Sequence, residues 1–397
     1  MTKARLAFPP RPRGGASVAF ALSLLLLSAP AFAGPGVTPT EVVVGTHVDL
    51  SGPLAPMGTA VRNGLEMGVD DANAKGQMWG RKITLVVADN GYDPARALAA
   101  ERNELSPDRI FAIMGPVGTP PVAAAMPAFV NAGALHLFPF APADETYVPH
   151  QPLEFALDLP LAAQMRDGLD ALLAGRDRRV GVLYRDDTFG RRVLTAVERE
   201  LQRRGARPPV VESFRPGAVT MTRQLAALRA DGAEIVVIGG IAQDAIAAMK
   251  SARRYAPQFL CPQSCYVPQV PTLGGRNVSG LYAVATTPIP YPDDPDPALR
   301  SWVRRYENRF HTVASAEAFR AYLDTRLFAE VLKRAGPALT RARFARTLEA
   351  MAPWRDPVYG GVPIDFTGRD HLGFHAGFLA QVKAGRWITI ASTQSKH

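Results

Sequence analysis

The residues best suited to binding a ligand lie in residues 110–129, where an apolar run leads through a turn into an amphipathic stretch. Residues 110–114 predict a buried strand, and Gly115 and Gly118 mark the turn that follows it. Thr119 can cap a helix whose first turn contains two prolines. Because a helix start leaves several backbone N–H groups without partners and carries partial positive charge, this turn predicts an anion-binding site.

Side chains suited to catalysis are missing from this turn, which contains no Lys, Ser, His, Asp or Glu. His371 and His375 have the i,i+4 spacing that suits a metal on a helix, but they are expected where a turn enters a strand. The acidic pairs are expected on helix and loop surfaces: Asp70-Asp71 and Asp186-Asp187. GxSxG, Walker and HExxH patterns do not occur. We therefore expect no enzyme, no metal site and no cofactor.

The N-terminal sequence predicts a signal peptide over residues 1–33. It contains basic residues, an apolar core over Val18–Leu27 and the small-x-small sequence Ala31-Phe32-Ala33. The core is about half as long as a membrane-spanning helix requires. We expect removal of this segment, a mature chain that begins near Gly34, and a soluble protein exported to the periplasm.

The charge and the cysteine content limit the classes of partner and metal site that we expect. Four of the nine net positive charges lie in the expected signal peptide. The remaining +5 is spread as single Arg residues along the expected helices, which is typical of a solvated surface and not of a nucleic-acid-binding face. The two cysteines, Cys261 and Cys265, can form a local disulfide in an oxidising compartment if the loop geometry allows it. Two Cys without neighbouring His do not make a zinc site.

Strands and helices alternate at the short spacing of βα units from Glu41 to Arg254. A Pro-rich stretch over residues 139–160 divides the alternation into two series, and a second Pro-rich zone precedes three helices and the last short strands. This pattern predicts an α/β protein with two mainly parallel sheets and helices on both faces. Ligands of such sheets bind beyond the carboxyl ends of the strands.

The ordered set of motifs resembles the periplasmic solute-binding proteins of the leucine/isoleucine/valine-binding type, which serve ABC importers for branched-chain and other amino acids. The matching segments are VVVGTHVDLSGPLAPMG, GLEMGVDDANAKG, ITLVVADNGYDPARA, GPVGTPP, FPFAPADE, VGVLYRDDTFGRRVLTAVERELQRRG, IVVIGG and GLYAVAT. Each motif is loose alone, but the set covers nearly all of the expected mature chain in order.

This resemblance implies the type 1 periplasmic binding protein fold, with two Rossmann-like lobes joined by a three-crossing hinge that closes on the ligand. It places residues 38–158 and 287–348 in lobe 1, and residues 159–286 and 349–392 in lobe 2. It also implies a monomer that binds a small molecule and meets an ABC permease in the inner membrane, without a nucleic-acid partner.

The resemblance also names the residues expected to bind the ligand. Gly118 and Thr119 match the turn that binds the ligand's carboxylate, and Phe189 matches an aromatic residue that closes from lobe 2. The full expected set is Met57, Val117, Gly118, Thr119, Phe140, Ala141, Pro142, Phe189 and Gln263.

Three positions depart from the family pattern. Pro142 replaces a common hydroxyl residue, and Ile241 stands where an aromatic residue is common. Gln263 falls where amino-acid binders carry a Glu that faces the ligand's ammonium, a charge-assisted contact that contributes about 1.5–3 kcal/mol. These departures point to an acid without a free α-amine, or an aromatic carboxylate, as the ligand.

The first functional hypothesis is therefore the substrate-binding component of an ABC importer, which binds an amino acid or a small carboxylate-bearing solute between the lobes. The second is a periplasmic sensor of the same fold that signals to a membrane kinase or regulator; adjacent permease and ATPase genes would favour transport. A periplasmic enzyme is the third, and turnover of a candidate ligand would be needed to support it.

Overall fold

The computed structural model describes residues 34–141, 150–252 and 254–392, so the expected signal peptide lies outside the described residues. Most strands belong to two sheets, whose members are β1 (Glu41–Val48), β2 (Lys82–Asp89), β3 (Ala112–Met114), β4 (Leu135–Leu137), β5 (Glu154–Phe155), β6 (Val180–Arg185), β7 (Val210–Phe214), β8 (Ile235–Gly239), β9 (Gln258–Cys261), β10 (Tyr282–Ala285), β13 (Phe378–Lys383) and β14 (Arg386–Ser392). A small third sheet pairs β11 (Trp354–Asp356) with β12 (Gly360–Ile364).

The helices cover both main sheets. They are α1 (Ala55–Lys75), α2 (Pro94–Arg102), α3 (Thr119–Asn131), α4 (Leu161–Leu173), α5 (Thr188–Arg203), α6 (Thr222–Ala230), α7 (Ala242–Ala252), α8 (Gln269–Gly274), α9 (Pro297–Phe310), α10 (Ala316–Ala335) and α11 (Arg341–Ala350). None of the described helices is both long enough and apolar enough to cross a membrane.

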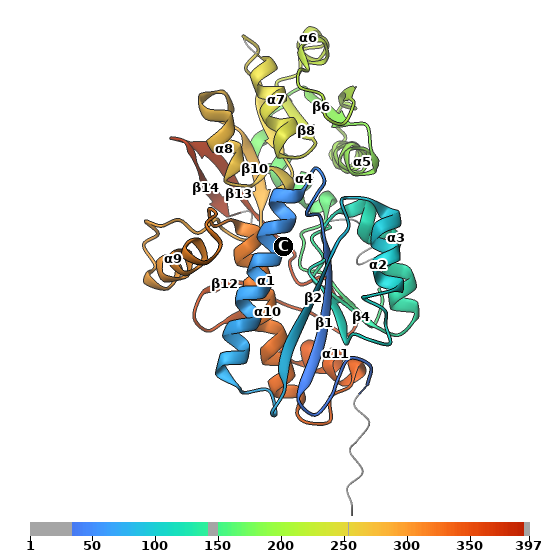
Figure 1. The fold of residues 1–397 in the computed structure, drawn as a ribbon. Coiled ribbons are helices and arrows are strands. Elements are labelled where there is room, and N and C mark those ends of the chain that lie inside the picture. Colours follow the sequence, from blue (N-terminus) through green and yellow to red (C-terminus); the bar gives the residue numbers. More distant parts are fainter. Residues whose placement is uncertain (1–33, 142–149, 253, 393–397) are drawn as a thin grey trace, which may run out of the picture. The chain divides into compact units, whose positions relative to one another are not determined.

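The first sheet is parallel throughout, in the order β2-β1-β3-β4-β5. Val42 and Val44 of β1 pack into a buried cluster with α1, α10 and α11, whereas Val43 packs on the opposite face with α2 and α3. Burial on both faces explains why β1 is almost continuously apolar. Figure 1 shows α1 and α10 side by side along one face of this sheet.

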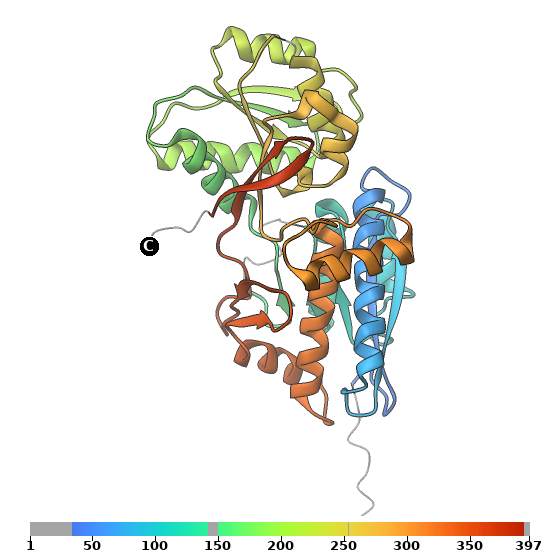
Figure 2. The same cartoon turned by 90° about the vertical axis from the view of Figure 1, so that its left-hand side faces the viewer.

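The second sheet has the order β14-β13-β10-β9-β8-β6-β7. Its strands from β7 to β10 are parallel, and the β13–β14 hairpin adds an antiparallel edge, drawn in red in Figure 2. Helices α4 and α5 pack on one face, and α6, α7 and α8 pack on the other. The prediction of an α/β fold with two mainly parallel sheets is confirmed.

The chain passes between the sheets three times: after β5, after β10 and before β13. The apolar residues of the segment 351–374 pack with the first sheet, and Phe366 lies 6.2 Å from Phe138 and 5.2 Å from Phe155 between ring centroids. The expected change to lobe 2 after residue 348 differs from this packing, because Phe155 lies on β5 and Phe138 directly follows β4.

Two strands do not follow from the sequence pattern. β5 has two residues and lies inside the Pro-rich stretch that was expected only to separate the two series. β9 has four residues and follows α7 after a short loop, so its run is too short to show a period. Both strands matter for the site, because residues that follow them line it.

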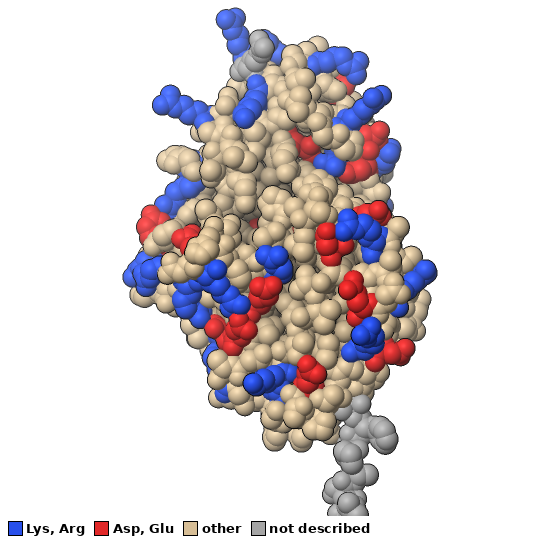
Figure 3. Space-filling view, viewed as in Figure 1, with Lys and Arg blue, Asp and Glu red and all other residues tan. Residues whose placement is uncertain are grey.

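Charged residues of both signs are interspersed on the face shown in Figure 3. Several form exposed ion pairs, such as Arg305 with Asp71 at 2.9 Å and Arg309 with Asp70 at 2.6 Å. Arg305 and Arg309 therefore have acidic neighbours, and exposed pairs of this kind contribute about 0–1 kcal/mol each to the free energy of unfolding.

Glu154 of β5 is a buried carboxylate. Its side chain is 2 % exposed, and neither of its oxygens has a hydrogen-bond partner among the described residues. Burial raises its pKa to about 8. The folded chain therefore holds a proton at Glu154 that the unfolded chain releases at lower pH.

Replacing Glu154 with Gln is expected to stabilise the protein increasingly as the pH rises from 4.5 to about 8. The wild-type chain loses stability over this window because folding must retain or take up the Glu154 proton, whereas Gln has no such proton. Thermal unfolding of both proteins at about pH 5 and about pH 8 measures the effect. An equal difference in unfolding temperature at both pH values would contradict it.

Candidate ligand-binding site

A cavity lies at the carboxyl ends of strands from both sheets. Residues that follow β1, β2, β3, β4 and β5 line one side, and residues that follow β6, β8 and β9 line the other. This is the position at which parallel α/β sheets bind ligands. The lining residues are Leu54, Met57, Tyr92, Gly118, Thr119, Phe140, Asp158, Phe189, Ile241, Gln263 and Ser264.

The turn before α3 offers one backbone donor to this cavity. The Val117 N–H donates to the His47 carbonyl at 3.0 Å, and the Gly118 N–H donates to the Phe140 carbonyl at 3.1 Å. The two prolines after Thr119 have no N–H. The Thr119 N–H is thus the one amide of the turn without a hydrogen-bond partner among the described residues. The expectation of several such N–H groups is wrong, because neighbouring strands and prolines account for the others.

Gly118, and not Thr119, is the N-cap of α3. Its φ of 102° is a conformation that side-chain-bearing residues rarely adopt. A Cβ at this position would also lie 3.1 Å from the ring of Tyr92 and 3.3 Å from Pro121. Glycine therefore lets Tyr92 pack against the turn that presents the Thr119 amide.

A buried polar network supports the turn from below. The Asn90 side-chain amide donates to the Val117 carbonyl at 2.9 Å and lies 3.0 Å from Nδ1 of His47. Nε2 of His47 lies 3.1 Å from Oε1 of Glu101. Asn90 Oδ1 also accepts the Tyr92 N–H at 2.8 Å. One side chain thus ties the turn before α3 to the loop that carries Tyr92.

The start of α1 is shaped by Asp49. Its carboxylate accepts the N–H of Ser51 at 3.2 Å and that of Leu54 at 2.7 Å. Gly58 lets the helix approach closely, since a Cβ there would lie 1.9 Å from the Asp49 carbonyl oxygen. Leu54 and Met57 are thereby held at the wall of the cavity.

Asp158, at the first crossing between the sheets, forms a buried ion pair with Arg320 of α10. The same guanidinium donates to the carbonyls of Phe138 at 3.2 Å and Pro139 at 3.1 Å, and it lies 4.0 Å from the centroid of the Phe140 ring. Arg320 therefore holds two lining residues, Asp158 and Phe140, and supplies the counter-charge of the acid.

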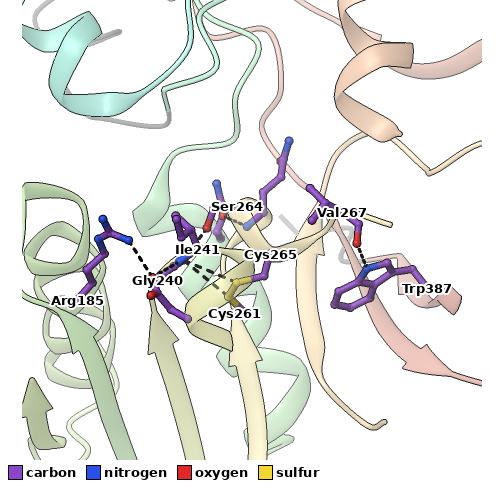
Figure 4. Close-up of a disulfide and its surroundings, with 11 residues drawn as sticks. Arg185, Gly240, Ile241, Cys261, Ser264, Cys265, Val267 and Trp387 are labelled. Carbon is purple, nitrogen blue, oxygen red and sulfur yellow. Dashed lines mark hydrogen bonds and ion pairs between the residues drawn. A yellow bond between two sulfur atoms is a disulfide. The ribbon is translucent and has the colours of Figure 1, made fainter. Parts of the chain in front are cut away.

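A disulfide shapes the wall that follows β9. Cys261 and Cys265 are bonded, as their spacing allowed (Figure 4). Gln263 and Ser264 lie between them in the chain. The Gln263 N–H donates to Oε1 of the buried Gln164 at 2.9 Å, and Ser264 Oγ donates to the Gly240 carbonyl at 2.9 Å. The loop thus presents a neutral amide side chain and not a carboxylate.

An ion cluster lies at the starts of α5 and α7, beside Phe189 and Ile241. Arg185 Nε lies 2.7 Å from the Asp187 carboxylate, and its Nη1 lies 3.3 Å from that of Asp244. Asp187 caps α5, and Asp244 accepts the Ile241 N–H at 3.0 Å. Burial, together with the nearby Asp187 charge, raises the pKa of Tyr92 above its usual range. Tyr92 therefore stays a neutral hydroxyl at the cavity.

Most expected site residues line this one cavity: Met57, Gly118, Thr119, Phe140, Phe189 and Gln263. Val117 and Ala141 do not line it; both are fully buried, and Ala141 packs against Val122 and Met126. Pro142 lies outside the described residues. Their roles in binding stay a prediction.

Sequence reasoning missed Leu54, Asp158 and Ser264. The one signal for Asp158 was an acid in an otherwise apolar run before a proline, and that for Ser264 was its place between two cysteines. His371 lies elsewhere, where it pairs with Glu349 at 3.1 Å. The described residues contain no group of three or more His, Cys, Asp or Glu side chains that could hold a metal ion.

The chemistry of the cavity is that of a binding site for a small, partly apolar molecule. Its walls are mainly aliphatic and aromatic, and a backbone amide, a neutral glutamine and hydroxyl groups supply directed hydrogen bonds. Its single carboxylate, Asp158, is already paired with Arg320.

Comparison with known proteins agrees with this arrangement. The family described as periplasmic binding protein matches residues 41–386. A Leu/Ile/Val-binding protein homolog 7 from Brucella melitensis is 25 % identical over 329 residues, which cover 78 % of this chain and 82 % of the relative.

Solved structures show the same fold. A branched-chain amino acid ABC transporter protein from Thermus thermophilus with bound valine has a TM-score of 0.79 and 17 % identity, with 90 % of this chain and 97 % of that chain covered. An ABC transporter solute-binding protein from R. palustris in complex with benzoate has a TM-score of 0.76 and 17 % identity, covering 89 % and 96 %.

Proposed function

The chain belongs to the periplasmic binding protein family, and from that premise we propose that it is the substrate-binding component of an ABC importer for a small carboxylate-bearing solute. The observation that carries the proposal is the cavity lined from both sheets, with the unpartnered Thr119 amide at the start of α3. A carboxylate oxygen at this amide would complete the turn and gain from the helix dipole.

The charges around the cavity support an acid without an α-ammonium group as the ligand. Gln263, which follows β9, is neutral, and the carboxylate of Asp158, which follows β5, is already paired with Arg320. Two proteins of similar fold are described with valine and with benzoate, and a carboxylate is the group that these ligands share. Benzoate has no amine, so this fold accommodates acids of the proposed kind.

Hinge closure provides the transport signal in this proposal. Thr119 and Phe140 follow strands of the first sheet, while Phe189 and Gln263 follow strands of the second. A ligand that contacts both groups of residues favours the closed form, because only differential affinity shifts the equilibrium. The closed protein would then dock on a membrane permease at the periplasmic side.

A thermal-shift screen tests the proposal. Aliphatic acids, aromatic acids and amino acids are each compared with their methyl esters. At about one hundred times its Kd, a true ligand stabilises the protein by roughly 2.7 kcal/mol. We expect acids to raise the unfolding temperature and the esters to have no effect. Equal shifts by acids and esters, or no shift by any compound, would reject a carboxylate-binding function.

A further inference from the structure

A second cavity adjoins the candidate site. The two cavities share Leu54, Met57 and Ser264 in their walls. The remaining residues of the second cavity come from the start of α1, from α7, from α8 and from the start of α10: Pro53, Pro56, Ala60, Ala242, Gln243, Ile246, Val267, Gln269, Leu273, Ser315 and Glu317. Most of these side chains are apolar.

Glu317 is the one carboxylate in the wall of this second cavity. It is 2 % exposed and forms no ion pair among the described residues. The nearby Ser315 hydroxyl accepts the Ala318 N–H at 3.2 Å. Burial raises the pKa of Glu317 to about 7, although hydrogen bonds from Ser315 and from the backbone act in the opposite direction. A buried carboxyl of this kind is costly unless a cation pairs with it.

No ion pair among the described residues offsets the free energy lost by burying the Glu317 carboxyl. Position two of α10 favours an acid through the helix dipole, but an exposed acid would gain this without losing its hydration. Asp158, which lines the first cavity, has Arg320 as its partner. Glu317 is therefore the one carboxylate in either wall that lacks an ion-pair partner among the described residues, and a cation is expected to come with the ligand.

We propose that Glu317 binds a cationic amine of the ligand, which is separated from the ligand's carboxylate by an apolar spacer lying against Leu54 and Met57. This inference rests on the proposed function, since it places the carboxylate at Thr119. It refines the substrate class to amino acids whose amine is remote from the carboxylate. The neutral Gln263 fits this class, because no ammonium needs a counter-charge beside the carboxylate.

Isothermal titration with three matched ligand series tests the proposal. The first series contains ω-amino acids of increasing length (γ-aminobutyrate, δ-aminovalerate and ε-aminocaproate). The second contains the corresponding amine-free acids, and the third contains the α-amino isomers. We expect an ω-amino acid to bind the wild-type protein about 10- to 100-fold more tightly than its amine-free counterpart. We expect the α-amino isomers to bind no more tightly than the amine-free acids.

Glu317→Gln is expected to reduce that preference to about threefold or less while retaining affinity for the amine-free acid. Glu154→Gln is the matched control, because Glu154 is equally buried and also without an ion pair among the described residues but lines neither cavity. The control should keep the preference. Glu317→Leu provides a second variant if Gln at this position impairs folding.

The outcomes separate the two proposals. If the wild-type protein binds no acid of these series, the inference is overturned, and the proposed function is then decided by the thermal-shift screen, which also contains aromatic acids. If amine-free acids bind as tightly as ω-amino acids, the function stands and the role of Glu317 is overturned. A preference that persists in Glu317→Gln also overturns it, because another group would then bind the amine.

Discussion

Replacing Arg320 with Met is expected to lower the free energy of unfolding by about 3–5 kcal/mol. The substitution removes the partner of Asp158 and leaves Asp324, 3.5 Å away on the same helix, without its nearest cation. Both carboxyl groups are buried, and burial already raises the pKa of Asp324 to about 7 with Arg320 present. Removing one member of a buried pair leaves an uncompensated charge, which costs more than the pair itself contributes.

The loss of stability in Arg320→Met should become larger as the pH rises. Without Arg320, both acids need a proton in the folded chain, and the unfolded chain releases these protons near pH 4. Stability is therefore lost as the pH rises, so the deficit should be larger at about pH 8 than at about pH 5. Denaturant unfolding at both pH values measures this difference.

Arg309→Met is the matched control, because Arg309 forms an ion pair with Asp70 that is exposed to solvent. We expect it to cost about 0–1 kcal/mol at either pH. A loss below about 1 kcal/mol for Arg320→Met would show that the buried pair is not structural.

Replacing Gly118 with Ala is expected to weaken carboxylate binding by about 10- to 100-fold and to destabilise the fold by about 1–3 kcal/mol. The φ of 102° is unfavourable for Ala, and the added Cβ would press on the Tyr92 ring at 3.1 Å. Relief of either strain moves the Thr119 amide, which is the proposed carboxylate donor. Misplacing the single backbone donor should therefore reduce affinity as well as stability.

Gly205→Ala separates strain from binding. Gly205 also has a positive φ, of 63°, but a Cβ there would meet nothing within 4 Å. It should therefore lose some stability and no ligand affinity. Titration of both variants with an acid that binds the wild-type protein provides the comparison. Unchanged affinity in Gly118→Ala would contradict the role of the turn.

Much of the fold could be predicted from the sequence because burial is periodic within each helix and strand. The alternation of apolar and amphipathic stretches predicted sheets covered by helices on both faces, and the packing of Val42, Val43 and Val44 confirms this for β1. β5 and β9 were not readable, since two to four residues cannot show a period. The packing of Phe366 against Phe138 and Phe155 was not readable either, because a contact over such separations leaves no local pattern.

The candidate site divides in the same way. The amino-acid sequence by itself determined the strand-to-helix turns, the glycine before Thr119 and the neutral residue at position 263, because these depend on residues adjacent in the chain. Only the tertiary structure decided that Arg320 pairs with Asp158, which lies 162 residues earlier, and that Glu317 lines a cavity beside Met57. Whether a buried acid has a partner depends on which elements pack together, and that choice is made by the whole core.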